Sequence, residues 1–485
     1  MGQSEMKSRA VKGVSWTLVE RFGIQSIKFV VGIILARLLS PEEFGIIGII
    51  TVFFLVAEVF IDSGFGQAYI QKKEVSEQDA NTVFYTNLLI SLALYGLIWF
   101  AAPLIAGFYE KEILLKLTRV MGLVIVVNAF SIIQVSQLTR AVNFKRKSKI
   151  SLIAITVSGL LGIGAAWRGM GVWSLVVLNL SERVLITAGL WITSKWIPSL
   201  TFSRESFKAM FRFGSWILFG AIVEKIFDNI YVLVIGKFFP FAQLGFYTQA
   251  KKMQRLSSQQ ITASVGIVTF PVFSQVRNDI PRLQNIVKKF LQQTLLFMSL
   301  IMTLLFVVAK PFVLIFLTEK WAPMIPYLQI LCLAGVIYPI NVVNVKVLLA
   351  LGKSRLNFNL SLIKNSLRIL NIILTYRYGI SAILMGEVAV AGISVLINAY
   401  YTGKYIQYGF FRQMKDIILI FIVMLAAGAA GVLSTLGIVS LWLFLAVGLA
   451  VTSAAFLAMH YLFNRNMLLE TLSLKNDLFG SSKKP

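Results

Sequence analysis

Long apolar stretches alternate with short polar segments along the whole chain. Fourteen of these stretches are long enough to cross roughly 30 Å of hydrocarbon as α-helices, at about 1.5 Å of rise per residue. Runs such as 88–98 and 417–427 are apolar on nearly all sides and lack the strict alternation of a membrane β-strand. The pattern therefore predicts an all-α integral membrane protein.

The composition agrees, because 57% of the residues are hydrophobic and only 14% are charged. The longest connections are too short to fold as soluble domains, so a catalytic domain outside the membrane is not expected. The predicted spans are 13–38, 44–61, 82–108, 117–138, 150–167, 171–194, 211–236, 243–270, 290–317, 325–350, 358–376, 379–402, 416–436 and 439–462.

Lys and Arg gather in alternate connections. One side of the predicted spans carries about 27 of them and the other about 7, which by the positive-inside rule places both termini in the cytoplasm. Cytoplasmic loops facing anionic lipid account for most of the net charge of +25. The sequence has no module in which aromatic residues stand among basic ones, so nucleic-acid binding is not expected.

Motifs for nucleotide hydrolysis, dinucleotide binding or zinc catalysis are absent from the sequence. The single cysteine, Cys332, excludes an internal disulfide and a thiolate metal cluster. We therefore expect no cofactor and no metal, and an energy source that is an ion or substrate gradient.

The chain contains an internal repeat. Residues 36–39, leading to Phe44-Gly45, resemble residues 236–239, leading to Leu244-Gly245, 200 positions later. Each predicted set has six spans, so both enter the membrane from the same side and form parallel repeats. The expected domains are an N-lobe (1–200), a C-lobe (201–405), a helical hairpin (406–465) and a cytoplasmic tail (466–485).

Ionisable residues inside the spans cost about 2.5–3.5 kcal/mol each at mid-bilayer, so they usually face a cavity or a partner. The basic ones outnumber the acidic ones, which favours a cavity for an anion. The candidate substrate-binding residues are Lys28, Arg21, Arg183, Lys346, Lys364 and Arg368. The candidate ion-coupling or gating residues are Glu224, Asp228 and Glu387. For any single residue, a structural salt bridge or snorkelling to the headgroups is the alternative.

Two details concern individual charges. Lys28 and Asp228 occupy equivalent places in the two repeats, so these opposite charges could pair across a cleft between the lobes. Lys251 and Lys252 are adjacent and cannot share one helix face, so at least one of them is expected to be peripheral.

A string of residues near the amino end resembles that of a known family. It consists of Leu38-Leu39-Ser40-Pro41-Glu42-Glu43-Phe44-Gly45, then residues 62–73, then Asn81-Thr82-Val83-Phe84. The string is similar to that of the Wzx-type polysaccharide exporters, close to the colanic and teichuronic acid members, of the multidrug/oligosaccharidyl-lipid/polysaccharide superfamily. The turn at 38–45 reads as a fold signature rather than a ligand site.

This resemblance implies a flippase, not an enzyme, that moves undecaprenyl-diphosphate-linked oligosaccharide across the bacterial cytoplasmic membrane by alternating access. It also implies two six-helix lobes around a central, often cationic cavity. The expected partners are the lipid-linked oligosaccharide and membrane lipids. H⁺ or Na⁺ are candidate coupling ions, and the polysaccharide polymerase machinery is a candidate contact.

Three alternatives remain open from the residues. A cation-coupled drug exporter of the same superfamily should have a cavity rich in acids and aromatics, whereas the charges here are net basic. A membrane polysaccharide polymerase or ligase usually needs a sizeable extracytoplasmic loop with Arg or His. A lipid scramblase or a structural membrane protein is also compatible with the sequence.

Overall fold

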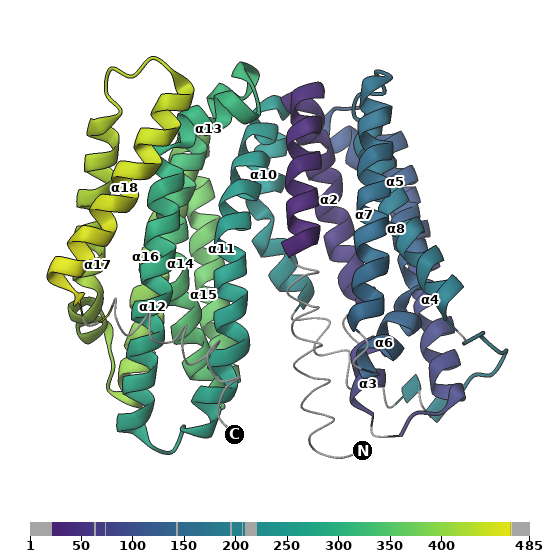
Figure 1. Ribbon diagram of the computed structural model, residues 1–485. Coiled ribbons are helices and arrows are strands. Elements are labelled where there is room, and N and C mark those ends of the chain that lie inside the picture. Colours follow the sequence, from purple (N-terminus) through teal and green to yellow (C-terminus); the bar gives the residue numbers. More distant parts are fainter. Residues whose placement is uncertain are drawn as a thin grey trace, which may run out of the picture. The chain divides into compact units, whose positions relative to one another are not determined.

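The computed structural model describes residues 22–62, 65–72, 74–141, 144–194, 196–205, 207–208, 221–465 and 467. Every regular element in these ranges is a helix (Figure 1). Apolar sequence favours this outcome because, in hydrocarbon, a helix satisfies its backbone hydrogen bonds within its own segment. Nine described helices are long and apolar enough to cross a membrane, or ten if one bent pair counts as a single span. The number fourteen therefore stays a prediction.

The described chain divides into two compact units, Met1–Gly245 and Phe246–Pro485. The first contains helical stretches at 22–38 and 221–228, together with α2 (Pro41–Asp62), α3 (Phe65–Gln71), α4 (Glu77–Tyr109), α5 (Ile113–Ala129), α6 (Ile132–Arg140), α7 (Phe144–Trp167), α8 (Trp173–Thr193) and α10 (Ile230–Phe238). Helix α11 (Phe241–Gln275) crosses the boundary. The second unit continues with α12 (Ile280–Val307), α13 (Ala309–Phe316), η1 (Glu319–Met324), α14 (Ile325–Ala350), α15 (Ser354–Thr375), η2 (Tyr376–Tyr378), α16 (Ile380–Ile406), α17 (Phe410–Ser434) and α18 (Leu441–Phe463).

Each predicted span contains helix in its described residues. The boundary between the compact units falls at residue 245, whereas the sequence repeat places the lobe boundary near residue 200. The compact units follow packing, whereas the predicted lobes follow the repeat, so the predicted domain limits remain a prediction.

Three of the predicted spans are interrupted in their described residues, and one of them, 211–236, has a turn at Asn229 before α10. The span at 117–138 consists of α5 and α6, which are bent by 40° at Phe130-Ser131. The span at 290–317 breaks at Val308 between α12 and α13. Pro311 follows this break and has no N–H to donate to the carbonyl of Val307, which explains why one continuous helix does not form there.

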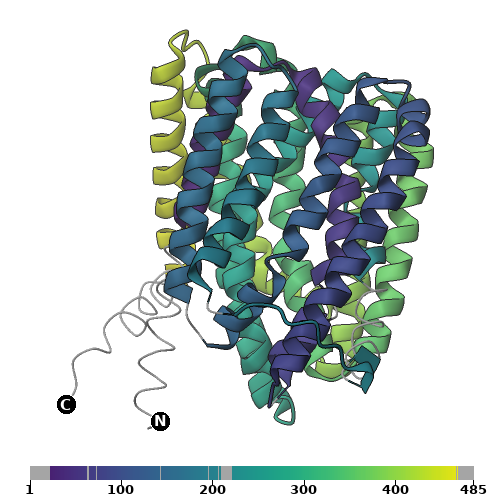
Figure 2. The same cartoon turned by 90° about the vertical axis from the view of Figure 1, so that its right-hand side faces the viewer.

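Within each unit, helices joined by short connections pack side by side (Figures 1 and 2). In the first unit α7 packs on α8, and α4 packs on α5. In the second unit α16 contacts both α14 and α15, while α17 and α18 form a hairpin that packs on α12. Helix α16 is thus central to the packing of its unit, which matters for the charges it carries.

The turn at 38–45 begins α2. Ser40 and Glu43 form a reciprocal cap, in which the Ser40 N–H donates to Glu43 Oε2 (2.6 Å) and the Glu43 N–H donates to Ser40 Oγ (3.4 Å). Pro41 fits the first helical position because its missing N–H would have no partner there. Residues 38–45 therefore cap and begin a helix.

The same turn makes a close backbone contact within the first unit. A β-carbon on Gly45 would overlap the carbonyl oxygen of Phe241, and one on Gly245 would overlap that of Pro41. The first turns of α2 and α11 therefore pack directly against each other, and only glycine permits this approach.

Candidate functional site

Helix α8 carries two adjacent charges in the first unit, and each forms an ion pair with a different helix. Lys28 Nζ lies 3.1 Å from Glu182 Oε1, and Arg183 Nη2 lies 2.7 Å from Glu58 Oε1. The described ion pair of Lys28 is thus with α8 rather than with Asp228. These contacts connect the stretch at 22–38, α2 and α8 through charged side chains inside the apolar region.

Glu58 is the partner that the sequence analysis missed. Apart from the first turn and the terminal Asp62, it is the only ionisable residue of α2. An isolated acid in an otherwise apolar span is costly unless it finds a cation, so its position was the available signal. Its partner could not be read from the sequence, because Arg183 lies 125 positions away.

In the second unit, Lys251 of α11 pairs with Glu387 of α16 at 2.7 Å. Only 16% of the lysine side chain and 20% of the glutamate side chain are exposed. The ammonium also lies 5.5 Å from the centre of the buried Tyr247 ring, within cation–π range. Lys252, its neighbour in sequence, is exposed, as helix geometry requires.

Glu387 begins a polar stripe on one face of α16, which we define as Glu387, Ser394, Asn398 and Thr402. Their spacing of seven, four and four residues keeps them on one side of the helix. Asn398 accepts a hydrogen bond from Lys364 Nζ of α15 (3.4 Å) and donates one to Asn341 Oδ1 of α14 (2.8 Å). The stripe therefore gathers polar side chains from three neighbouring helices.

The other described candidates lie on α14, α15 and the stretch at 221–228. Arg368, one turn after Lys364, donates to Asn365 Oδ1 on its own helix (3.2 Å). Lys346 and Asp228 are half-buried, and Glu224 is exposed. Arg21 lies outside the described residues. Among the described residues, no hydrogen bond or ion pair joins Lys346 to the α16 stripe.

The charge balance of the second unit is strongly one-sided. Helices α11, α14, α15 and α16 carry a single acidic residue, Glu387. The same helices carry eight basic residues: Lys251, Lys252, Arg255, Lys346, Arg355, Lys364, Arg368 and Lys404. Such an arrangement suits an anionic ligand, since Lys and Arg bind phosphate oxygens through charge-assisted hydrogen bonds.

The ion pairs of the two units join equivalent helices of the predicted repeat, but the acid and the base are exchanged between them. Helices α2 and α11 each follow the repeated turn, and α8 and α16 are each the last helix of their predicted set. In the first unit the second helix supplies the acid Glu58 and the sixth supplies the base Arg183. In the second unit the second helix supplies the base Lys251 and the sixth supplies the acid Glu387.

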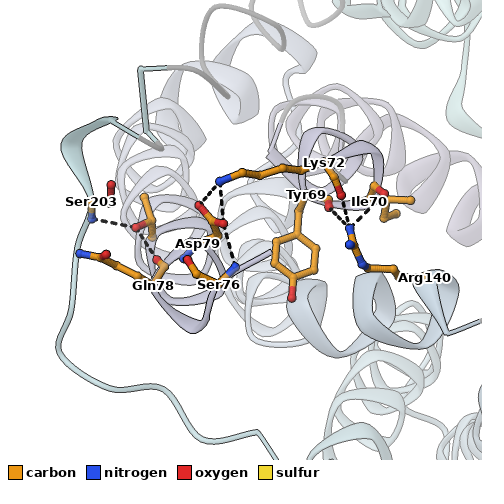
Figure 3. Close-up of polar contacts among 9 residues, drawn as sticks. Tyr69, Ile70, Lys72, Ser76, Gln78, Asp79, Arg140 and Ser203 are labelled. Atoms are coloured by element: carbon orange, nitrogen blue, oxygen red, sulfur yellow. Dashed lines mark hydrogen bonds and ion pairs between the residues drawn. The ribbon is translucent and has the colours of Figure 1, made fainter. Parts of the chain in front are cut away.

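The remaining motif residues form a separate polar cluster (Figure 3). Lys72 Nζ contacts both carboxylate oxygens of Asp79, at 2.8 and 2.7 Å, and Asp79 forms a capping box with Ser76 at the start of α4. Arg140 donates to the carbonyls of Tyr69, Ile70 and Lys72, which satisfies backbone groups at the end of α3.

Asn81 and Thr82 continue this cluster along α4. Asn81 Nδ2 donates to the hydroxyls of Ser199 (2.6 Å) and Thr201 (2.8 Å), and the Ser203 N–H donates to Thr82 Oγ1 (2.9 Å). These bonds fix the segment after α8 against the start of α4. The cluster consists of an ion pair, a helix cap and hydrogen bonds that its polar groups make with one another, so its role is structural.

The sequence is similar to a family and to proteins of polysaccharide biosynthesis. The model of a family described as "Polysaccharide biosynthesis protein" matches residues 34–326, more than half of the chain. The chain is 28% identical over 332 residues to the succinoglycan biosynthesis transport protein ExoT of Rhizobium meliloti (strain 1021), covering 68% of this chain and 67% of that protein. It is 26% identical over 356 residues to the teichuronic acid biosynthesis protein TuaB of Bacillus subtilis (strain 168), covering 72% of each.

Among solved structures, the lipid II flippase MurJ in an inward closed conformation has a TM-score of 0.77 at 18% identity. The match covers 94% of this chain and all of that one. At this identity the likeness shows the fold alone. Together, these findings confirm the resemblance to polysaccharide exporters inferred from the residues at 38–84.

Proposed function

Because the chain belongs to the polysaccharide biosynthesis protein family, we propose that it is a flippase for a lipid-linked oligosaccharide in the bacterial cytoplasmic membrane. The proposed substrate is an undecaprenyl-diphosphate-linked oligosaccharide. The protein would carry its headgroup from the cytoplasmic to the outer leaflet by alternating access, with both termini in the cytoplasm. The name of ExoT, a succinoglycan biosynthesis transport protein, supports transport, and the name of TuaB, a teichuronic acid biosynthesis protein, supports a part in polysaccharide biosynthesis.

One observation carries the proposal: the basic excess of α11, α14, α15 and α16, on which Glu387 is the only acid. A diphosphate with several sugars cannot cross hydrocarbon without a polar, cationic path, whereas its prenyl tail can stay in the bilayer. Lys364 and Arg368 are half-buried on α15, and Lys364 reaches the α16 stripe. They would neutralise phosphate or acidic sugars, with Lys28, Arg21, Arg183 and Lys346 as further candidates.

The acids would serve the transport cycle in another way. Glu387 forms an ion pair with Lys251, which supports a gating role for this residue. Glu224 and Asp228 would hold a coupling H⁺ or Na⁺. If flipping proceeds equally well without a proton or sodium gradient, the coupling ion is refuted, whereas the proposed substrate is not affected.

The experiment that tests the function is deletion in the native host, followed by analysis of lipid-linked sugars. We expect the oligosaccharide precursor to accumulate in the cytoplasmic leaflet and surface polymer to disappear. Complementation with the intact chain should restore export, and complementation with Arg368→Glu should not. Normal leaflet distribution of the precursor in the deletion strain would contradict the proposal.

A further inference from the structure

We infer that Lys251 is an anion-binding residue of the transport site, and that Glu387 occupies it until a phosphorylated substrate takes the place of the carboxylate. The inference rests on the flippase function proposed above. It adds Lys251 to the substrate-binding residues of that function. It also explains the presence of Glu387, the only acid on α11, α14, α15 and α16.

The first support is the incomplete bonding of Glu387. Its Oε1 lies 2.7 Å from Lys251 Nζ, but its Oε2 is buried and accepts no hydrogen bond from any residue that the structure describes. Buried carboxylates in proteins are usually hydrogen-bonded at both oxygens, because an unmet acceptor costs free energy. Glu387 is therefore held mainly through Lys251, and a better-bonded anion can replace it.

The second support is the chemistry of the competitor. A phosphate carries more negative charge than a carboxylate and offers three strong acceptor oxygens. The ammonium of Lys251 has three donors and rotates freely about a flexible stem, so it can turn from one anion to another without a change of backbone. Lys251 thus prefers a diphosphate to a carboxylate when both are within reach.

The third support is the surrounding charge. Lys251 pairs with an acid on α16, whereas Lys364 meets only the neutral amide of Asn398 among its described partners, at 3.4 Å. Both contacts fall on the α16 stripe, since Glu387 and Asn398 share a face of that helix. Glu387 and Asn398 are 11 residues apart, about 16 Å along the helix, so the two lysines line a path for an anion along the stripe rather than one binding point.

Binding of farnesyl diphosphate to the full-length protein in lipid nanodiscs tests the inference by calorimetric titration. Lys251→Gln should weaken binding about tenfold, which is one charge-assisted hydrogen bond. Glu387→Gln should tighten binding severalfold, because the competing carboxylate is gone. In the double variant, binding should equal that of Lys251→Gln, since Glu387 acts through Lys251. Lys252→Gln, the exposed neighbour, is the matched control and should bind like the wild type.

A charge-swapped variant, Lys251→Glu with Glu387→Lys, addresses folding. It keeps an ion pair between the two helices, so its melting temperature should stay near that of the wild type. We expect its farnesyl diphosphate binding to be lost, because the cation has moved to the other helix. If the pair has only a structural role, the swap restores normal binding, and this result would overturn the inference.

Two other results separate this inference from the proposed function. Weaker binding in Glu387→Gln, or unchanged binding in Lys251→Gln, would refute the exchange at Lys251 while leaving a diphosphate flippase intact. Absence of saturable binding in the wild type, together with normal precursor distribution in the deletion strain, would refute the function itself.

Discussion

Gly45 and Gly245 stand 200 positions apart at equivalent places in the repeat, and each packs against the first turn of the other's helix. Gly45 faces the carbonyl of Phe241, and Gly245 faces the carbonyl of Pro41. The contact is reciprocal, and each glycine stands at the end of one copy of the predicted repeated turn. The contact explains why the repeated turn ends in glycine in both copies.

Alanine at Gly45 or Gly245 should therefore be strongly destabilising. The atom in the way is a backbone carbonyl oxygen, which cannot move aside as a flexible side chain could, and overpacking of this kind costs about 1–3 kcal/mol or more. Thermal melting of the purified variants in detergent measures the effect. Gly107→Ala is the control, since an added β-carbon there meets nothing within 4 Å. Equal melting temperatures for all three variants would contradict the close contact.

The positions of the helices could be predicted from the sequence, but most of the charge pairs could not. Apolar runs of spanning length must be helical in a bilayer, so each predicted span contains helix in its described part. The partners of charged residues depend on which helices are neighbours and on their rotation. Residue spacing along one helix carries no such information. Arg183 was identified as a candidate, but its partner Glu58 became evident only when α2 and α8 were placed.

The breaks inside the spans at 117–138 and 290–317 were missed for a related reason. Hydropathy averaged over a span is insensitive to a local bend, since it reports composition and not the direction of the backbone. Lys251 shows the opposite case, where the sequence separated two adjacent lysines correctly but did not indicate which one turns inward. The neighbouring carboxylate of Glu387 explains why it is Lys251.

Glu58 and Arg183 offer a test of whether Arg183 binds substrate or only stabilises the fold. Glu58→Gln leaves a half-buried guanidinium without its carboxylate, and loss of one partner of a buried pair costs about 3–5 kcal/mol, less where the pair is partly exposed. Exchanging the two residues, Glu58→Arg with Arg183→Glu, should recover the stability. Precursor flipping in cells then decides the role of Arg183: export that returns with the exchange assigns it to the fold, and export that stays lost assigns it to the substrate.

Asp79 and Lys72 should contribute unequally to the stability of the fold, although they form one ion pair. Asp79 is 1% exposed and also accepts the Ser76 N–H at the start of α4, whereas Lys72 is nearly half exposed. Asp79→Ala removes the ion pair and the cap, so it should cost about 1–3 kcal/mol. Lys72→Gln keeps the capping box and a hydrogen-bond donor beside Asp79, so it should cost less than Asp79→Ala. Melting temperatures that fall equally would show that the cap contributes little.

Asn344 of α14 and Gln413 of α17 form a buried amide pair with two hydrogen bonds, of 3.0 and 2.9 Å. Replacement of either one by Leu leaves the side-chain oxygen of the other amide without its donor, which costs about 1–3 kcal/mol. The double replacement removes both polar groups at once. Its loss of stability should therefore be smaller than the sum of the two single losses, and a double-mutant cycle measures the difference. Additive losses would show that the two amides do not depend on each other.

Tyr408 lies in the connection between α16 and α17, and its contribution to the stability of the fold should change at alkaline pH. Burial raises the pKa of its hydroxyl well above the usual range, and the hydrogen bond to Asp416 Oδ2 (2.9 Å) raises it further. The folded state therefore holds this proton more tightly than the unfolded state, whose tyrosine pKa is about 10. The contribution of Tyr408 is complete below about pH 10 and is lost as the pH rises toward its folded pKa. Melting temperatures of the wild type and Tyr408→Phe should differ by a constant amount from pH 6 to 9 and converge above pH 10. A difference that grows with pH would mean that the phenolate, not the phenol, is the form stabilised beside Asp416.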